Sequence, residues 1–210
     1  MGAGAVNLSI LIPHKSTPRN DQALELNLKM LRENTREQDR EVIVVENYGD
    51  PYLMWNEYAK HARGRVLAFT SSDMLPAPDW DVLMLKHTHG TAVVTGYLIE
   101  SGVIGVASQN IERDFGKSPQ TFRREEFEKA CEAYQFPDAV PGRGWYMPVM
   151  WTKDFFLNRL GGYQFIKPFP YHNDIHTFEK CEQLGAEFIR TRSFHFHFQA
   201  LSFTEHDARR

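Results

Sequence analysis

Residues 66 to 74 have the sequence VLAFTSSDM, an apolar run that stops abruptly and is followed by one carboxylate, Asp73. An unbroken apolar run of this length is typical of a strand that is buried on both faces of a parallel sheet. Ligands of open α/β sheets bind at the carboxyl ends of the strands. Asp73 is therefore a candidate for holding a divalent metal against a diphosphate, and the alternative is an Asp in an ordinary turn.

The first ninety residues alternate apolar runs with amphipathic segments. Buried strands are predicted over 7–13, 41–46 and 66–70, and helices over 17–33 and 50–64. Both helices are predicted to begin with a Thr or Asp cap followed by proline at the first helical position. This β-α-β-α-β order predicts an α/β fold with a mixed, mostly parallel sheet flanked by helices.

The second half of the chain combines short strands, helices and polar loops. Strands are predicted over 91–98, 103–108, 145–151, 187–191 and 194–198, and helices over 127–134, 152–160 and 173–184. Residues 109–121 are predicted to be a mobile loop, and residues 136–144 a second loop. Because no repeat or linker interrupts the chain, we expect one domain over 7–210, preceded by a leader or tag remnant at 1–6.

Composition excludes several classes of protein. The 210 residues carry a formal net charge of -3, so the chain has no global attraction to nucleic acid or acidic membranes. No apolar run is long enough to span a membrane, and the N-terminus lacks the pattern of a secretory signal. The two cysteines, Cys131 and Cys181, are predicted to be buried free thiols, which fits a reducing, cytoplasmic location.

The segment from Phe194 to Phe198 alternates phenylalanine with histidine. In a strand this pattern puts the phenylalanines on one face and both His195 and His197 on the other. The histidines are exposed or hydrogen-bonded in the structural interpretation and bind metal in the functional one. If Asp73 lies nearby, a carboxylate with a neutral imidazole suits Mn²⁺ better than Mg²⁺. We expect only one of the two histidines to be the ligand, because they lie about 6–7 Å apart along the strand.

Two further groups carry candidate chemistry. Asp174 is predicted in the first turn of a helix, where it is either a helix cap or a general base. Glu46 and Asn47 follow the second strand, where they either bind a ribose or a base edge or form an Asx turn with Gly49.

Taken together, residues 8–202 resemble a family-two glycosyltransferase of the A-type, Rossmann-like fold. The residues that carry the resemblance are the following: Ser9 to Pro13 with the opening strand; Val44 to Gly49 with Val-Val-Asp-Asp-Gly-Ser; Asn56 and Ala62 to Gly64 with the Asn-x-Gly-x-x-x-Ala-x-Gly helix; Phe69 to Met74 with Phe-Leu-Asp-x-Asp-Asp; Leu160 to Tyr163 with Leu-Gly-Gly-Phe; and Asn173, Asp174, Lys180 and Gly185 with Glu-Asp-x-Asp-Leu-x-x-Arg-x-x-x-x-Gly.

The chain departs from the family pattern at several positions. Ser71 replaces the first acid of the metal motif and leaves Asp73 as its only carboxylate. Asn173 and His176 replace acids on either side of Asp174, and Tyr58 replaces a glycine. Metal binding is therefore expected to depend more on histidine than in the family, and an inactive homologue is the extreme alternative.

The resemblance implies a metal-dependent, inverting transfer from a nucleotide-diphospho-sugar, most simply a UDP-sugar, to an acceptor hydroxyl. It places the donor in a half over about 7–90 and the acceptor in a half over about 91–205. Asp73 with His195 or His197 would hold the metal, and Asp174 would be the base, with Asp138 and Asp114 next in line. The donor-binding residues implied are Pro13, His14, Ser16, Glu46, Asn47, Asn56, Ser71, Ser72 and Asp73.

The acceptor side is predicted around the two polar loops. Trp145 and Tyr146 offer flat aromatic faces for a sugar or a base, and Arg143 offers charge. Basic residues gather around the same loops, namely Arg113, Lys117, Arg123, Arg124 and Arg143. These basic residues either form a solvated charged face or bind an anionic acceptor, which includes modified nucleic acid. A protein or glycan acceptor is equally compatible with the sequence.

Two other functions share this architecture. A nucleotidyltransferase would need a glycine-rich basic loop after the first strand, and residues 14–20 contain no glycine. A non-catalytic module that binds a sugar nucleotide or a glycan would differ from an enzyme only in lacking turnover.

Overall fold

The structure is a computed structural model, which describes residues 6–46, 50–103, 106–107, 109–144, 147–167 and 173–199. The strands are β1 (Leu8–His14), β2 (Arg40–Glu46), β3 (Val66–Phe69), β4 (Met74–Pro76), β5 (Val93–Glu100), β6 (Ile111–Glu112), β7 (Ala139–Pro141), β8 (Val149–Thr152) and β9 (Phe188–His197). The helices are α1 (Pro18–Asn34), α2 (Pro51–His61), α3 (Trp80–Leu85), α4 (Arg124–Ala133) and α5 (Asn173–Gln183), with the 3₁₀ turn η1 (Pro119–Thr121) and the π-helix η2 (Phe155–Leu160).

The described strands form one nine-stranded mixed sheet. Its central path runs in the order β2-β1-β3-β8-β5-β9-β4, with β6 paired to β5 and β7 to β9. Most of the paired residues lie in parallel ladders, of which β1–β2 and β5–β9 are the longest. The predicted mixed and mostly parallel α/β sheet is confirmed.

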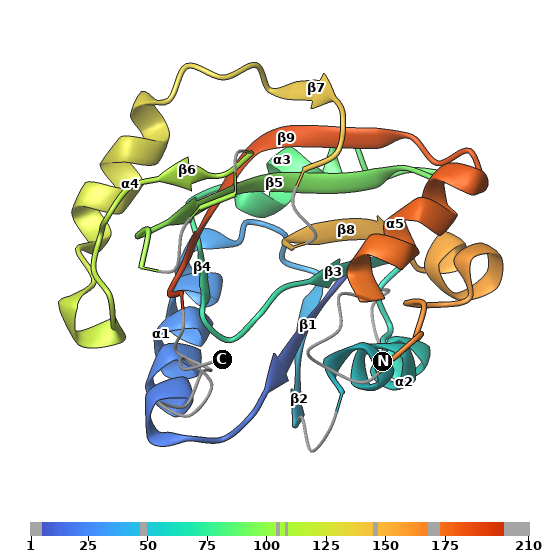
Figure 1. Cartoon of the computed structure of the whole chain (residues 1–210), viewed down its shortest axis with the longest axis horizontal. Helices are drawn as coiled ribbons and strands as arrows, with labels where there is room; N and C mark the ends of the chain where they lie inside the picture. Colours follow the sequence, from blue (N-terminus) through green and yellow to red (C-terminus); the bar gives the residue numbers. More distant parts are fainter. Residues whose placement is uncertain are drawn as a thin grey trace.

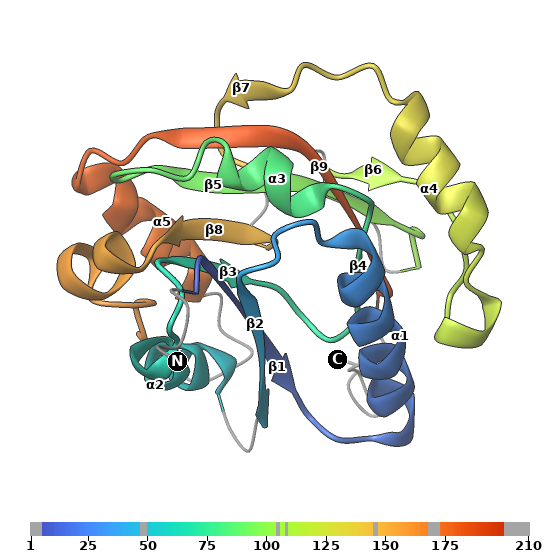
Figure 2. The ribbon, with the colours of Figure 1, turned by 180° about the vertical axis from the view of Figure 1, so that it is seen from behind.

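Helices cover both faces of the sheet (Figures 1 and 2). Leu31 of α1 and Trp80 and Met84 of α3 pack with the buried side chains of β1 on one face. On the other face α2, η2 and α5 pack together around Phe69. Helix α4 lies over the far end of β9 instead, where its Phe127 joins a third cluster. The helices therefore cover the two faces of the sheet and not the ends of its strands, where a ligand binds in an open α/β sheet.

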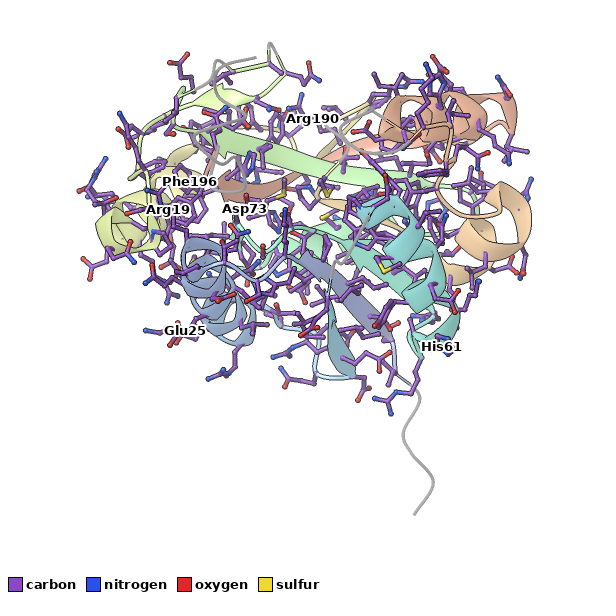
Figure 3. All side chains as sticks on the ribbon, turned by 60° about the horizontal axis from the view of Figure 1, so that its bottom comes forward. Arg19, Glu25, His61, Asp73, Arg190 and Phe196 are labelled. Atoms are coloured by element: carbon purple, nitrogen blue, oxygen red, sulfur yellow. The ribbon has the colours of Figure 1, made fainter. Side chains whose placement is uncertain are left out.

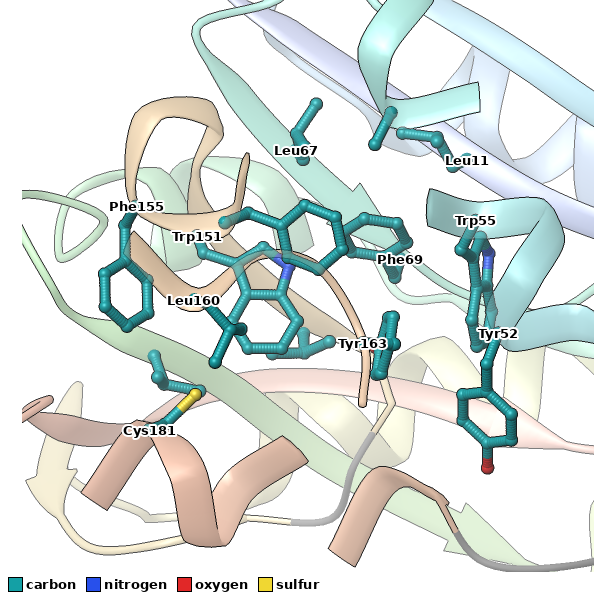
Figure 4. Packing of buried hydrophobic residues seen from close by; sticks show 14 of the residues in the cluster. Leu11, Tyr52, Trp55, Leu67, Phe69, Trp151, Phe155, Leu160, Tyr163 and Cys181 are labelled. Atoms are coloured by element: carbon teal, nitrogen blue, oxygen red, sulfur yellow. The ribbon is translucent and has the colours of Figure 1, made fainter. Parts of the chain in front are cut away.

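An aromatic cluster fixes the middle of the second face (Figure 4). The rings of Trp55 and Tyr163 stack with centroids 5.1 Å apart, and Phe69 and Phe156 meet at 4.9 Å. Asn56 of α2 ties this cluster to the turn after η2, because its amide accepts from Tyr163 N at 2.7 Å and donates to Tyr163 O at 3.0 Å. Gly162 of that turn has φ +85°, and a Cβ there would lie 2.5 Å from the Asn56 oxygen.

The helix starts follow the sequence prediction. Thr17 caps α1 by accepting from Asn20 N at 3.2 Å, and Asp50 caps α2 by accepting from Tyr52 N at 2.9 Å. Both helices carry proline in the first turn.

The second half differs from the prediction in several places. The two strands predicted within 187–198 are one continuous strand, because β9 keeps β5 as a partner along its length while it changes its other neighbour from β7 to β4. The described residues 147 and 148 precede β8 and are not part of it, although they were predicted as strand, and β4 and α3 were not predicted. The described residues of 103–108 form no strand, and β5 pairs with Ile111–Glu112 instead.

The predicted mobile loop over 109–121 contains β6 and η1. Both cysteines are buried and free, as predicted. No helix in the described part of the chain is long and apolar enough to cross a membrane. The predicted leader, 1–6, lies almost wholly outside the described residues.

Candidate active site

Three polar side chains meet where β5 and β9 end and β4 begins: Asp73, Glu100 and His197 (Figure 3 marks Asp73). Asp73 directly precedes β4, whose Met74 pairs with His197 of β9. Glu100, the last residue of β5, pairs with His197 in the parallel ladder on the other side. Backbone pairing therefore places one imidazole between two carboxylates.

The two nitrogens of His197 face different partners. Nδ1 lies 2.9 Å from Glu100 Oε1, a good hydrogen-bond distance. Since a carboxylate only accepts, Nδ1 carries a proton in this contact. Nε2 points the other way and lies 3.6 Å from Asp73 Oδ2, which is longer than a hydrogen bond.

Neighbouring groups fix the orientation of both carboxylates. Ser71 Oγ donates to Asp73 Oδ1 at 2.5 Å, which leaves Oδ2 for the histidine side. Asn110 Nδ2 donates to the second oxygen of Glu100, Oε2, at 2.8 Å. Phe198 N donates to the main-chain oxygen of Asp73 at 3.0 Å, so the residue is also held through its backbone.

The charges of the group reinforce one another. Burial alone would lower the pKa of His197, but the negative charges of Asp73 and Glu100 outweigh burial and raise it to about 9. Burial likewise opposes ionisation of Asp73, whereas the His197 charge and the Ser71 hydroxyl bring its pKa below the ordinary value. Two buried carboxylates facing one imidazole make a place that attracts positive charge.

The donor set of this group fits a divalent metal. Carboxylate oxygens are ligands of Mg²⁺, Ca²⁺ and Mn²⁺, and imidazole nitrogens are ligands of transition metals, so a pair of the two favours a transition metal over Mg²⁺. The described residues contain no group of three His, Cys, Asp or Glu side chains able to hold a metal. Glu100 lies on the Nδ1 side of His197. Asn27 adds an orphaned acceptor beside the pair: Nδ2 donates to Ser71 O at 2.8 Å, while the buried Oδ1 has no partner among the described residues.

His195 has a different environment, although it lies on the same face of β9. Its ring packs edge-on against Trp80 with centroids 5.0 Å apart. It is buried, neither ring nitrogen has a hydrogen-bond partner among the described residues, and burial lowers its pKa to about 3. The structure brings His197, and not His195, to Asp73; which one binds metal stays a prediction, now with His197 favoured.

The predicted donor residues gather at the carboxyl ends of the first three strands. His14, the last residue of β1, pairs in register with Glu46, the last of β2. His14 Nε2 contacts Asp21 Oδ1 at 2.8 Å and Ser16 Oγ donates to the same carboxylate at 3.2 Å. The buried Nδ1 of His14 has no partner among the described residues.

Other predicted donor residues separate into three cases. Ser72 is buried beside Asp73, and Pro13 lies half-buried in β1. Asn47 lies outside the described residues. Both ends of the Asn56 amide contact the main chain of Tyr163, which gives this side chain a structural role, and its role in donor binding stays a prediction.

Asp174 lies at the start of α5, beside α2 and away from the end of β4 (Figures 1 and 2). Its Oδ1 accepts from Ile175 N at 3.0 Å, a contact within the first turn of α5, so the choice between helix cap and base stays open. The carboxylate also acts on Tyr52: burial first, and then the Asp174 charge, raise the pKa of that phenol. The structure thus groups Asp174 with Tyr52, and its role as a base stays a prediction.

Of the three predicted acceptor residues, the structure describes only Arg143. Trp145 and Tyr146 lie outside the described residues. Arg143 contacts Glu182 at 2.7 Å and lies over the ring of Phe188, so it stabilises the packing of α5 against β9.

Sequence reasoning missed Glu100, Asn110 and Asn27. The signal for Glu100 was present, because it ends an apolar strand with a carboxylate as Asp73 does. Asn27 and Asn110 had no such signal, since they reach the site only through tertiary packing of α1 and of the segment after β5.

Compared by sequence, the chain matches no family model and no curated protein. Compared by structure, it matches the crystal structure of GalNAc-T7 with UDP, GalNAc and Mn2+, with a TM-score of 0.52 and 14% sequence identity. The chain has the fold of A-type glycosyltransferases. The match covers 92% of this chain and 44% of that protein, so this chain spans less than half of its neighbour. The similarity bears on the fold, and membership of family two stays a prediction.

Proposed function

We propose that the protein is a metal-dependent glycosyltransferase that takes a sugar from a nucleotide-diphospho-sugar, most simply a UDP-sugar. One observation carries the proposal. Asp73 and His197 turn their free atoms toward each other at the carboxyl ends of the strands, which is where ligands bind in open α/β sheets. The neighbour with the same fold was solved with UDP and Mn2+, which supports the choice of ligand.

Asp73 Oδ2 and His197 Nε2 would hold the metal. A bound divalent metal supplies electrostatic stabilisation for the negative charge that grows on the leaving diphosphate. His197 must give up its Nε2 proton for this, so metal and proton compete for the same atom.

Glu100 and Ser71 are positioning residues in this proposal. Glu100 holds the Nδ1 proton of His197 and so leaves Nε2 to face Asp73. Ser71 holds one oxygen of Asp73 and leaves the other free. Glu100 also contributes a second negative charge to the site. The family pattern has an acid at the position of Ser71, and Ser71 carries no such charge.

The nucleotide would lie along the ends of β1, β2 and β3. His14 Nδ1 is a buried atom without a partner among the described residues, and it sits beside Glu46 at this edge. These groups, with Asn47 and Ser72, suit the hydroxyls of a ribose and the polar edge of a base.

The acceptor hydroxyl needs a base, because it is a poor nucleophile while it keeps its proton. Asp174 would take that proton as the oxygen attacks the anomeric carbon, and one direct displacement inverts the configuration there. Tyr52 would hold the carboxylate in place. Trp145 and Tyr146 would contact the acceptor sugar.

Calorimetry tests the donor site directly. We expect UDP to bind more tightly with Mn²⁺ than with a chelator, and Asp73→Asn to abolish that difference. Asp154→Asn, a change of an exposed acid at the start of η2, is the matched control. Equal UDP affinity with Mn²⁺ and with chelator would remove the metal from the proposal.

Single-turnover transfer tests the base and separates an enzyme from a binding module. Asp174→Asn should lower the transfer rate by about 10²–10⁴-fold and leave UDP affinity within a few-fold, since the loss falls on the transition state. Tyr52→Phe should lower the rate much less. If Asp174→Asn transfers sugar at the normal rate, the base is elsewhere; if it lowers stability alone, the carboxylate is a helix cap.

A further inference from the structure

A polar cleft of about 410 Å³ lies between the first turns of α1 and the segment around η1. It is lined by Arg19, Gln22, Lys117, Ser118, Pro119 and Gln120. No carboxylate and no large apolar side chain is among these residues. A ligand that suits such walls carries negative charge and accepts hydrogen bonds.

The two cations of the cleft are not neutralised by the protein. Neither Arg19 nor Lys117 has an ion pair, a side-chain hydrogen bond or an aromatic partner among the described residues. The other four members of the predicted basic group are engaged. Arg123 contacts Asp114 and Glu126, Arg124 contacts Glu33 and Glu128, Arg143 contacts Glu182, and Arg113 lies over the ring of Phe115.

The turn that carries Lys117 is held by hydrogen bonds to its backbone. Thr121 Oγ1 accepts from Lys117 N at 3.1 Å and from Ser118 N at 3.2 Å. Gly116 precedes them with φ +125°, and a Cβ at this glycine would lie 2.4 Å from Thr121 O. The Gln120 side chain donates to Gln22 Oε1 and so joins this wall to α1. The two cations therefore face the cleft from walls whose backbones are held.

The cleft is connected to the candidate metal site through α1. Arg19 lies in the first turn of this helix and Asn27, two turns later, donates to Ser71 O beside Asp73. Eight residues of helix rise about 12 Å along its axis, so the cleft lies about two turns of α1 from the candidate metal site, a separation on the scale of a small molecule. Arg19 and Asp73 also appear on the same side of the molecule in Figure 3, away from His61.

We infer that this cleft binds a single phosphate monoester carried by a small acceptor, with Arg19 and Lys117 as its two cationic contacts. A guanidinium can bind two phosphate oxygens at once, and an ammonium adds a point charge. A nucleic acid needs an extended basic surface, and ion pairs or ring contacts engage the other members of the basic group. The role as acceptor site rests on the proposed transferase function; the anion site itself does not.

Titration calorimetry without nucleotide or metal tests the anion site alone. The probes are glucose 6-phosphate, glucose and inorganic phosphate, and the protein is the full chain. We expect saturable binding of glucose 6-phosphate and of phosphate, and none of glucose. The double change Arg19→Gln with Lys117→Gln should weaken that binding at least about 10-fold, as expected for the loss of two charge-assisted contacts. Arg32→Gln with Lys129→Gln, which removes two exposed cations outside the cleft, should change it less than about 2-fold.

Each outcome bears on the inference. No saturable binding of either phosphate, or equal loss in both double variants, would overturn it. Tight binding of single-stranded DNA that Arg19 and Lys117 control would replace the monoester by a polyanion. If UDP fails to bind with Mn²⁺ while glucose 6-phosphate binds, the transferase proposal fails and the anion site stands.

Discussion

His195 and His197 lie two residues apart on the same face of β9, yet the structure makes them chemical opposites. His195 packs against Trp80 under α3, and burial lowers its pKa to about 3. His197 lies beyond that helix, between Asp73 and Glu100, and its pKa is raised to about 9 despite burial. Strand alternation decides which face a side chain takes, but the neighbouring elements decide whether it is core or site.

The two histidines differ in the polar partners around them. Around His195 the contacts are apolar, so the imidazole is a ring that fills space. Around His197 every polar atom is either satisfied by a positioning residue or turned toward a partner, as Asp73 Oδ2 is. Only the second arrangement presents carboxylate oxygens beside the imidazole.

The largest expected difference between the two histidines is in metal binding. His197→Gln should weaken Mn²⁺ binding by at least about 100-fold, because it removes a direct ligand where loss of an outer partner alone costs about 10–100-fold. His195→Leu, similar in size and apolar, should change it less than about 3-fold. Calorimetric Mn²⁺ titrations of both variants, with circular dichroism to verify folding, measure this. Comparable losses in the two would break the distinction.

A smaller effect is expected from the residue behind His197. Glu100→Ala should weaken Mn²⁺ binding by about 10-fold, the lower end of the range for outer partners, because the His197 ring loses the group that fixes its orientation. Glu100→Gln keeps an acceptor and should recover part of that loss. Glu112→Gln, at the end of the neighbouring strand β6, is the control. Full affinity in Glu100→Ala would mean that the strand alone orients His197.

The sequence predicted much of the fold because its first half is locally consistent. Apolar strands and capped helices with proline at their starts agree with one another from Leu8 to Phe69. The second half was predicted less well, since β4 is three residues long and β9 is held together by three different neighbours. Those pairings join segments that are far apart in the sequence, so no local sequence pattern predicts them.

The candidate site divides in the same way. Asp73 and His197 carried local signals, a carboxylate after a strand and an imidazole in alternation. Choosing His197 over His195 required knowing that α3 covers one of them, which depends on packing alone. Asn56 occupies a motif position, yet both ends of its amide contact the main chain of Tyr163, next to the tight turn at Gly162.

The smallest predicted effect is a difference in how stability depends on pH, measured without metal. The folded pKa of His195, about 3, lies below the unfolded value of about 6.5. Its contribution is therefore fully present above pH 6.5 and is lost as the pH falls toward 3. The folded pKa of His197, about 9, lies above the unfolded value, so its contribution is present below pH 6.5 and is lost as the pH rises to 9. Each slope is at most about 1.4 kcal/mol per pH unit.

Urea unfolding in chelator from pH 5 to 9 separates the two slopes. Between pH 5 and 6.5 His195→Leu should flatten the loss of unfolding free energy, because its side chain has no proton to take up on unfolding. Between pH 6.5 and 9 His197→Gln should flatten the opposite loss. The carboxylates Asp73 and Glu100 titrate below this range, since both have pKa values under their ordinary ones. If His195→Leu instead changes the alkaline side, the two imidazoles have been assigned to the wrong surroundings.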